Sequence, residues 1–359
     1  YLDNLKIVLV ASVILGHAFI TYSELGSWAY RDPSDNDVFN LVAAVFVALG
    51  SLFAMGLFFL VAGLLTPGPV RRKGPAGFLR DRAVRLGVPF LAYALLVFPL
   101  VTWAGEREHP FSWYLRDQLT DPDPGPLWFV GVLLLFSLVY VAWRTVRPAP
   151  PPADPPAPDQ PGLGRLLVVL ALAIAVGSFV LRLQFPVDSP QILSAHVWQW
   201  PQCIGLFVLG LLAAERGWLQ PVAPGLRRAG GWAAGAGALV MMASIATAPS
   251  ADPFAGGPTW QSALTSACEG AIAVGLSVWL LGVFQRRFDH AGALATALGR
   301  AAFGAYVLQA PVLVTFALLA STLSVAPEVR FLIVAPAGVA GSFALSWLLT
   351  RVPGVRRIL

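Results

Sequence analysis

Long apolar runs alternate with short breaks that are polar or rich in proline and glycine, and this pattern continues along the whole chain. A helix needs about 20 apolar residues to cross roughly 30 Å of hydrocarbon, and lipid offers no partner to an unpaired backbone group. The pattern therefore predicts an all-α integral membrane protein, a bundle of about ten transmembrane helices. The predicted spans are residues 4–23, 38–65, 84–104, 126–143, 165–183, 198–214, 231–248, 260–284, 301–320 and 330–350.

The composition supports a chain that is dissolved in lipid. Of its 359 residues, 57% are hydrophobic and only 12% are charged, whereas a soluble domain carries about 25% charged residues. We expect a single membrane domain over residues 1–359. The segment at about 145–164 is rich in proline and is predicted to be an extended cytoplasmic linker.

The cations lie mostly on one side of the predicted bundle. If the first helix starts in the cytoplasm, 19 of the 24 lysines and arginines lie on the cytoplasmic side. By the positive-inside rule, this asymmetry predicts an even number of spans with both termini in the cytoplasm. The net charge of +5 then belongs to a membrane face that contacts lipid, and not to a nucleic-acid-binding surface.

The two cysteines, Cys203 and Cys268, both fall inside predicted helices. Their positions match neither a metal-ligand spacing nor a disulfide framework, so we expect buried apolar residues and no bound metal. Lysine is rare, whereas alanine, glycine, proline and arginine are abundant. This composition suggests a GC-rich bacterial source, and the predicted location is the bacterial inner (plasma) membrane.

The first predicted helix carries ionisable residues at unusual depth. At about 100° per residue, Lys6 and His17 differ by only about 20° in direction, and Asp3 lies on the same face. At 1.5 Å per residue, His17 lies about 16 Å deeper than Lys6. Ionisable groups in a membrane are costly and usually mark a pathway or a site, and histidine accepts and returns a proton near neutral pH. The alternative is a snorkelling lysine and a histidine that is hydrogen-bonded inside the bundle.

The same stretch, YLDNLKIVLVASVILGH, resembles the first helix of the acyltransferase-3 family of multi-pass membrane acyltransferases. The family signature is a basic residue, ten residues and a histidine, which Lys6 and His17 match, and Asp3 matches an acidic residue usually found just ahead. Further segments resemble family motifs in order: FFLVAGLLT (58–66, with Ala62 in a serine position), FLRDRAVRLGVPFLAY (78–93), GPLWFVGVLLLF (125–136) and LGRAAFGAYVLQAPV (298–312, with Gln309 in place of a histidine). The resemblance covers nearly the whole chain.

This resemblance implies transfer of an acyl group, often acetyl from acetyl-coenzyme A, to a hydroxyl of a carbohydrate, glycolipid or other cell-envelope or small-molecule acceptor. The donor is made in the cytoplasm and carries phosphates, which arginine binds bidentately. Arg80, Arg82 and Arg85, at the cytoplasmic mouth of the third span, are the candidate residues for its nucleotide end. Lys6 either steadies a phosphate or pairs with Asp3. The alternative is that these cations only follow the positive-inside rule and bind anionic lipid.

His17 is the candidate general base, which takes the proton from the acceptor hydroxyl as that oxygen attacks the thioester carbonyl. A covalent acyl-imidazole on the same histidine is the mechanistic alternative. Asp3 and Glu269 are the other candidate catalytic residues. Glu269 lies about nine residues into the eighth span, where a carboxylate is costly unless it is protonated or paired. Its open roles are to orient His17, to bind the acceptor, or to fix helix packing as a protonated residue.

The predicted outer loops combine tryptophans with polar residues, which suits a sugar-like acceptor as well as an interfacial aromatic belt. Trp128 lies in a family-like motif, and Gln202 lies next to Pro201, where a broken helix would free polar groups. Glu24 lies on the His17 face about two turns further out. These three are the candidate acceptor-binding residues. The identity of the acceptor, its side of the membrane, and the choice between monomer and homo-oligomer stay open.

A second class of function also fits part of the pattern. A multi-pass transporter or lipid flippase also has about ten spans, helices interrupted by glycine and proline, and buried ionisable groups. Such a protein would not need an arginine cluster facing the same bundle as a histidine in this spacing, and it should not bind acetyl-coenzyme A.

Overall fold

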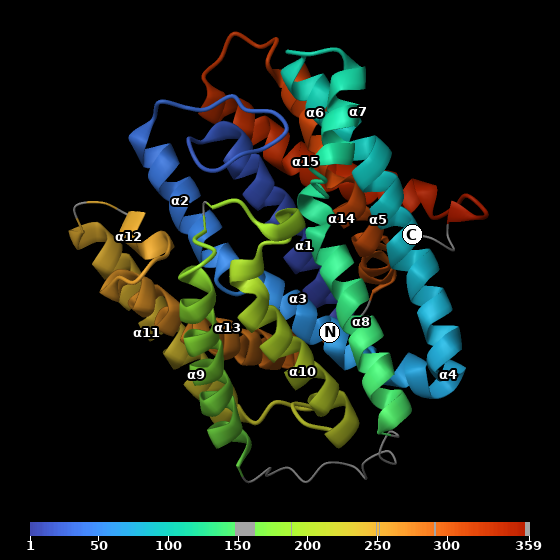
Figure 1. Cartoon of the computed structure of the whole chain (residues 1–359), viewed down its shortest axis with the longest axis vertical. Helices are drawn as coiled ribbons and strands as arrows, with labels where there is room; N and C mark the ends of the chain where they lie inside the picture. Colours follow the sequence, from blue (N-terminus) through green and yellow to red (C-terminus); the bar gives the residue numbers. More distant parts are fainter. Residues whose placement is uncertain (148–161, 188, 249, 251, 291, 356–359) are drawn as a thin grey trace.

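The computed structural model describes residues 1–147, 162–187, 189–248, 250, 252–290 and 292–355, and this part of the chain contains no strand. Ten helical segments in it are long and apolar enough to cross a membrane. The predicted all-α multi-pass fold with ten spans is therefore confirmed, and the cytoplasmic placement of the termini stays a prediction. The helices (Figure 1) are α1 (Leu2–Tyr22), α2 (Asp37–Ser51), α3 (Ala54–Leu65), α4 (Pro67–Arg82), α5 (Val88–Ala92), α6 (Phe98–Glu106), α7 (Phe111–Thr120), α8 (Trp128–Val146), α9 (Leu163–Arg182), α10 (Trp200–Arg216), α11 (Pro224–Thr247), α12 (Asp252–Ala255), α13 (Trp260–Arg287), α14 (Ala293–Ala320) and α15 (Pro327–Leu349).

The third span is longer than predicted, because it runs from α4 through α6, with a kink at Gly74, whose φ of 71° is not helical. Two π-helical turns, Ala83–Gly87 and Tyr93–Val97, join its parts. Pro89 and Pro99 follow these turns. Since proline has no N–H to donate, a wider turn ahead of it accommodates the missing backbone bond.

The fourth span is also extended, because α7 and a 3₁₀ turn precede α8. The predicted start at residue 126 missed α7, whose segment FSWYLRDQLT contains polar residues and no long apolar run. The predicted linker at 145–164 lies between α8 and α9, and its residues 148–161 lie outside the described residues.

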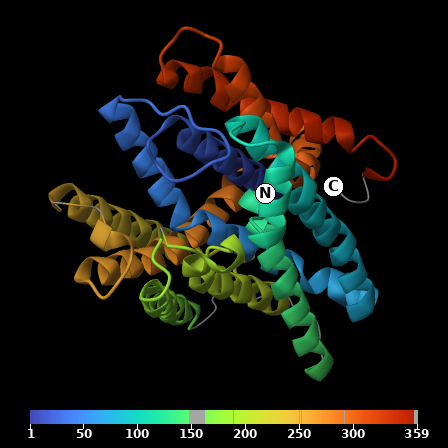
Figure 2. The ribbon, with the colours of Figure 1, turned by 45° about the horizontal axis from the view of Figure 1, so that its top comes forward.

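Two apolar cores share the length of α1. The first core gathers α1, α8, α14 and α15, and the second gathers α3, α9, α10 and α13. Leu5 and Leu9 of α1 belong to the second core, whereas Ile14 and Ala18 belong to the first. In Figure 2, α9 to α13 lie on one side of the molecule and α14 and α15 on the other. The half of α1 that carries His17 therefore packs in the first core.

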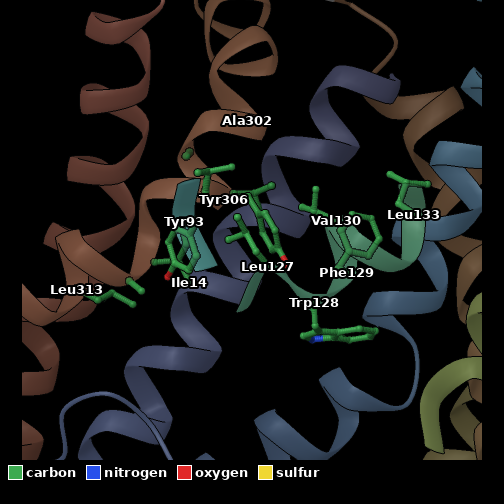
Figure 3. Packing of buried hydrophobic residues seen from close by; sticks show 14 of the residues in the cluster. Ile14, Tyr93, Leu127, Trp128, Phe129, Val130, Leu133, Ala302, Tyr306 and Leu313 are labelled. Atoms are coloured by element: carbon green, nitrogen blue, oxygen red, sulfur yellow. The ribbon is translucent and has the colours of Figure 1, made fainter. Parts of the chain in front are cut away.

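The close-up in Figure 3 shows this first core around the middle of α1, where Ile14 lies beside Tyr93 and Leu127. Tyr306 of α14 joins the same cluster and donates its hydroxyl to the carbonyl oxygen of Pro126. The indole of Trp128 lies at the edge of the cluster. This packing sets the spacing between α1, α8 and α14, the helices that surround the candidate site.

The predicted span at 231–248 corresponds to α11, which packs closely on α13 through glycine. A Cβ on Gly230 would lie 2.7 Å from the Gly275 carbonyl oxygen, and a Cβ on Gly275 would lie 2.6 Å from that of Gly230. Small residues let membrane helices approach at backbone distance, and this explains why the span contains few leucines.

Candidate active site

His17 lies in the last two turns of α1, and its side chain is half-buried. Its Nδ1 lies 2.9 Å from Oε1 of Gln309 on α14. The Gln309 Nε2 donates to the carbonyl oxygen of Tyr306 at 3.0 Å, which turns the amide so that its oxygen faces His17. Because an amide oxygen only accepts, Nδ1 carries the proton and Nε2 keeps its lone pair. The imidazole is thus held in a tautomer that can act as a base through Nε2.

Trp28 covers His17 from the loop that joins α1 to α2. The two rings are stacked, with centroids 4.3 Å apart and planes inclined by 24°. The Nε1 of Trp28 is buried, and it has no hydrogen-bond partner among the described residues. The Trp28 N–H is therefore a hydrogen-bond donor without an acceptor, next to the candidate base.

A second histidine reaches this region from the connection between α9 and α10. The His196 ring lies 5.0 Å from the Trp128 ring, and His196 lies within electrostatic reach of His17. Leu193, Ser194 and His196 have φ values of 51°, 48° and 43°. These left-handed conformations are unfavourable for residues other than glycine, so the surroundings hold them in place. Burial lowers the pKa of His196 to about 4, so the ring is neutral at pH 7.

The three arginines predicted to bind the donor lie together, and they differ in exposure. Arg80 and Arg85 are exposed, whereas Arg82 is half-buried. The Arg82 guanidinium lies 3.4 Å from the hydroxyl of Thr66 and 5.0 Å from the ring centre of Phe78. Among the described residues, none of the three arginines forms an ion pair. Their positive charge stays available to an anionic ligand.

Lys6 and Asp3 form a pair at the start of α1, with Nζ 2.7 Å from Oδ1. This is one of the two roles expected for Lys6. Asp3 also packs against α14, where a Cβ on Gly299 would lie 2.7 Å from the Asp3 Cβ. The pair lies three helical turns from His17, so the catalytic role of Asp3 stays a prediction.

Glu269 belongs to a separate polar cluster, which we call the Arg182–Glu269 network (Arg182, Gln202, Ser266 and Glu269). The Arg182 Nη2 lies 2.7 Å from Glu269 Oε2, and the two side chains are 1% and 0% exposed. Gln202 Nε2 donates to Glu269 Oε1 at 3.0 Å, and Arg182 Nη1 donates to the Ser266 hydroxyl at 3.0 Å. The network ties α9, α10 and α13 together. The contact to Nδ1 of His17 comes from Gln309 and not from Glu269, so these contacts favour a role in helix packing for Glu269 as the partner of Arg182, and not as the protonated residue that was expected.

The three candidate acceptor-binding residues are not brought to one place. Trp128 is buried beside His196, whereas Gln202 is fully buried and gives its amide N–H groups to Glu269 and to the Ser51 carbonyl oxygen. Glu24 is exposed just beyond the end of α1. The acceptor-binding roles of all three stay predictions.

The geometry adds residues that sequence reasoning did not select. Gln309 was noted only as a departure from a family histidine, and this position contacts His17. Trp28 had no signal beyond its place in an outer loop. Arg144 and Glu215 form a second buried ion pair, near the C-terminal ends of α8 and α10, with the Tyr140 hydroxyl donating to Glu215 Oε1 at 2.8 Å. In the part of the chain that the structure describes, no group of three His, Cys, Asp or Glu side chains is placed to hold a metal ion.

Comparison with known proteins supports the same conclusion as the geometry. No curated protein and no solved structure matches the chain. The acyltransferase-3 family, described as "Acyltransferase domain", matches residues 1–351. A match over nearly the whole chain favours an acyltransferase over a transporter or flippase without acyl-transfer activity. The chain therefore belongs to the acyltransferase-3 family and is a membrane acyltransferase.

Proposed function

We propose that this acyltransferase moves an acetyl group from acetyl-coenzyme A to a hydroxyl of a carbohydrate-like acceptor at the bacterial inner membrane. The observation that carries the proposal is the contact between His17 Nδ1 and Gln309 Oε1 at 2.9 Å. It holds a histidine inside a membrane helix with the proton on Nδ1 and the lone pair on Nε2, which is the arrangement that a general base for a hydroxyl requires.

The donor fits the layout of α1 and α4. Arg80, Arg82 and Arg85 carry positive charge without acidic partners among the described residues. These arginines would hold the phosphates of the nucleotide end. His17 lies about 16 Å further along the membrane normal than Lys6, by the rise of the helix. The long, thin pantetheine arm would carry the thioester across this distance.

The reaction then proceeds at His17. The acceptor oxygen attacks the thioester carbonyl carbon, and Nε2 of His17 takes the hydroxyl proton as the new C–O bond forms. The carbonyl electron pair moves to its oxygen. When the carbonyl re-forms, the C–S bond breaks, and the imidazolium returns the proton to the departing sulfur. The products are the acetyl ester and coenzyme A.

The acceptor would approach from the end of the bundle that carries Glu24 and His196. Trp128 offers an apolar face there, and the His196 ring lies 5.0 Å from it. An aromatic face beside a polar ring suits a sugar, which has both apolar and hydroxyl-bearing sides. This end lies opposite the arginines, so donor and acceptor would meet at His17 from opposite sides.

The proposal is tested by the thermal shift of the detergent-purified protein with acetyl-coenzyme A. A ligand at about a hundred times its Kd stabilises by about 2.7 kcal/mol, which gives a clear rise in Tm. Acetyl-3′-dephospho-coenzyme A, and the Arg82→Ala variant with the full donor, should both give a smaller rise. Arg228→Ala is the matched control, because Arg228 is an exposed arginine on α11. No shift of the wild-type protein with saturating donor would contradict the proposal.

A further inference from the structure

Trp28 presents an unused hydrogen-bond donor beside the candidate base. We propose that Trp28 is a further catalytic residue, whose Nε1–H donates to the carbonyl oxygen of the acyl group while negative charge develops on it. This inference rests on the proposed acyl transfer at His17. It assigns to a single indole the function that backbone N–H groups serve in the oxyanion holes of many acyl-transfer enzymes.

The burial of the Trp28 Nε1–H is the first argument. The atom has no hydrogen-bond partner among the described residues, although no solvent reaches it. A buried donor without an acceptor costs about 1–3 kcal/mol, and phenylalanine would provide a stacking ring without this cost. An acceptor atom that arrives with the substrate would remove the penalty at the moment of reaction.

The stacking geometry is the second argument. The acceptor hydroxyl that bonds to His17 Nε2 lies in the plane of the imidazole. The carbonyl carbon approaches that oxygen from above or below the plane, so the carbonyl oxygen lies displaced from it. The indole lies 4.3 Å from the imidazole and nearly parallel to it, inclined by 24°. The plane of the indole therefore lies one ring layer from the plane of the imidazole, and a carbonyl oxygen displaced into that layer could accept the Nε1–H.

The loop that carries Trp28 is held firmly, which is the third argument. We call residues 23–36 the Trp28 loop. Arg330 Nη1 on α15 pairs with Asp32 Oδ2 at 2.6 Å, and the Ser34 hydroxyl donates to Glu328 Oε2 at 2.7 Å. The backbone N–H of Asp32 donates to the Thr21 carbonyl oxygen at 2.9 Å. A donor for a developing charge must be placed before the reaction, and these contacts provide that placement.

The packing of the Trp28 loop against α6 also holds the loop in place. A Cβ on Gly105 would lie 1.9 Å from the Ala29 carbonyl oxygen, so only glycine lets the Trp28 loop lie this close to α6. The residue next to Trp28 is therefore pressed against a transmembrane helix and cannot move outward while the helix stays in place. The Trp28 loop therefore has a fixed position beside the site.

The test replaces the N–H and keeps the ring. Trp28 is replaced by 3-benzothienylalanine, which has sulfur in place of the indole N–H, and Trp28→Phe is made as a second variant. The readout is release of coenzyme A from acetyl-coenzyme A, with glycerol as a simple hydroxyl acceptor. We expect kcat to fall by about 10²- to 10³-fold, the effect of removing one oxyanion donor. The KM for the donor and the Tm should stay near their wild-type values. Trp232→Phe is the control, since Trp232 is 80% exposed on α11.

The possible outcomes separate this inference from the proposed function. Wild-type kcat in the 3-benzothienylalanine protein would overturn the role of Trp28 and leave the proposed function intact. A raised KM for glycerol with unchanged kcat would also overturn it, because Trp28 would then only bind the acceptor. A wild-type protein that releases no coenzyme A would overturn the proposed function itself, and this inference with it.

Discussion

Two of the polar clusters inside the apolar bundle differ in the charge of the side chains that form them. The His17 cluster consists of a histidine, a glutamine and a tryptophan, all without a formal charge in the tautomer that Gln309 selects. The Arg182–Glu269 network contains a full positive and a full negative charge, 2.7 Å apart and almost completely buried. In the first, His17 and Trp28 are half-buried, and the Trp28 N–H has no hydrogen-bond partner among the described residues. In the Arg182–Glu269 network, the two charged side chains bind each other.

This difference separates a site that can bind from a site that holds helices together. A charge inside a membrane is tolerated only with a partner. The two charges of an ion pair therefore interact mainly with each other and are not available to a ligand. A neutral group can be left without a hydrogen-bond partner at a much smaller free-energy cost. A buried ionisable residue is therefore weak evidence for catalysis until its partner is known. Glu269 has such a partner in Arg182, whereas His17 is hydrogen-bonded to the neutral amide of Gln309.

The largest expected effect is on turnover in the first cluster. His17→Gln should lower kcat for acyl transfer by about 10²- to 10⁴-fold, because the base is lost. Its Tm should stay close to that of the wild-type protein, since the apolar contacts of α1 are kept. The measurement is coenzyme A release together with a thermal melt. Wild-type turnover in this variant would remove His17 from the mechanism.

The second prediction concerns the Arg182–Glu269 network, where a substitution should lower the stability of the protein. Glu269→Leu leaves the Arg182 guanidinium buried without its partner, which should destabilise the protein by about 3–5 kcal/mol. The double variant Arg182→Met/Glu269→Leu should recover most of this loss, because no unpaired charge remains. Thermal melts of the three proteins test this. If Glu269→Leu melts like the wild type and loses turnover, Glu269 is catalytic as first predicted.

A smaller effect is expected at Gln309, which positions His17. Gln309→Leu leaves the Nδ1–H without an acceptor, and a loss of about 1–3 kcal/mol corresponds to a fall of roughly 5- to 150-fold in kcat. The KM for the donor should not change. Gln309→His restores an acceptor and the residue that the family motif carries, so it should recover turnover. Equal rates for both variants would show that the 2.9 Å contact does not matter.

The smallest expected effect is the pH dependence of stability that comes from His196. Its pKa is about 4 in the folded protein, below the ordinary value of 6.5, so the unfolded chain binds more protons between these two values. Stability should therefore fall as the pH is lowered from about 6.5 towards 4, by on the order of 1 kcal/mol at pH 5 after allowance for partial exposure. His196→Asn should reduce this fall. Melts at pH 7 and pH 5 test the prediction, and identical pH slopes would contradict it.

The fold class of the protein and its ten spans could be predicted from the sequence alone. The ten spans and the all-α fold follow from apolar runs of membrane length, because lipid leaves a backbone few alternatives to a helix. The family resemblance rested on local motifs such as Lys6 and His17, with ten residues between them, and it was confirmed by the match over residues 1–351. The starts of the third and fourth spans were missed, because the polar helices α4 and α7 contain no long apolar run.

Which polar side chains contact each other across the bundle was decided only by the tertiary structure. His17 and Gln309 are 292 positions apart, and the contact depends on how α1 and α14 pack in the first core. The pairing of Arg182 with Glu269 likewise depends on α9 lying against α13. Composition and periodicity report whether a residue is buried, which a single helix determines. They do not report what faces that residue, because this is set by the rotation and spacing of other helices, and it decides whether a buried polar group is paired or free to react.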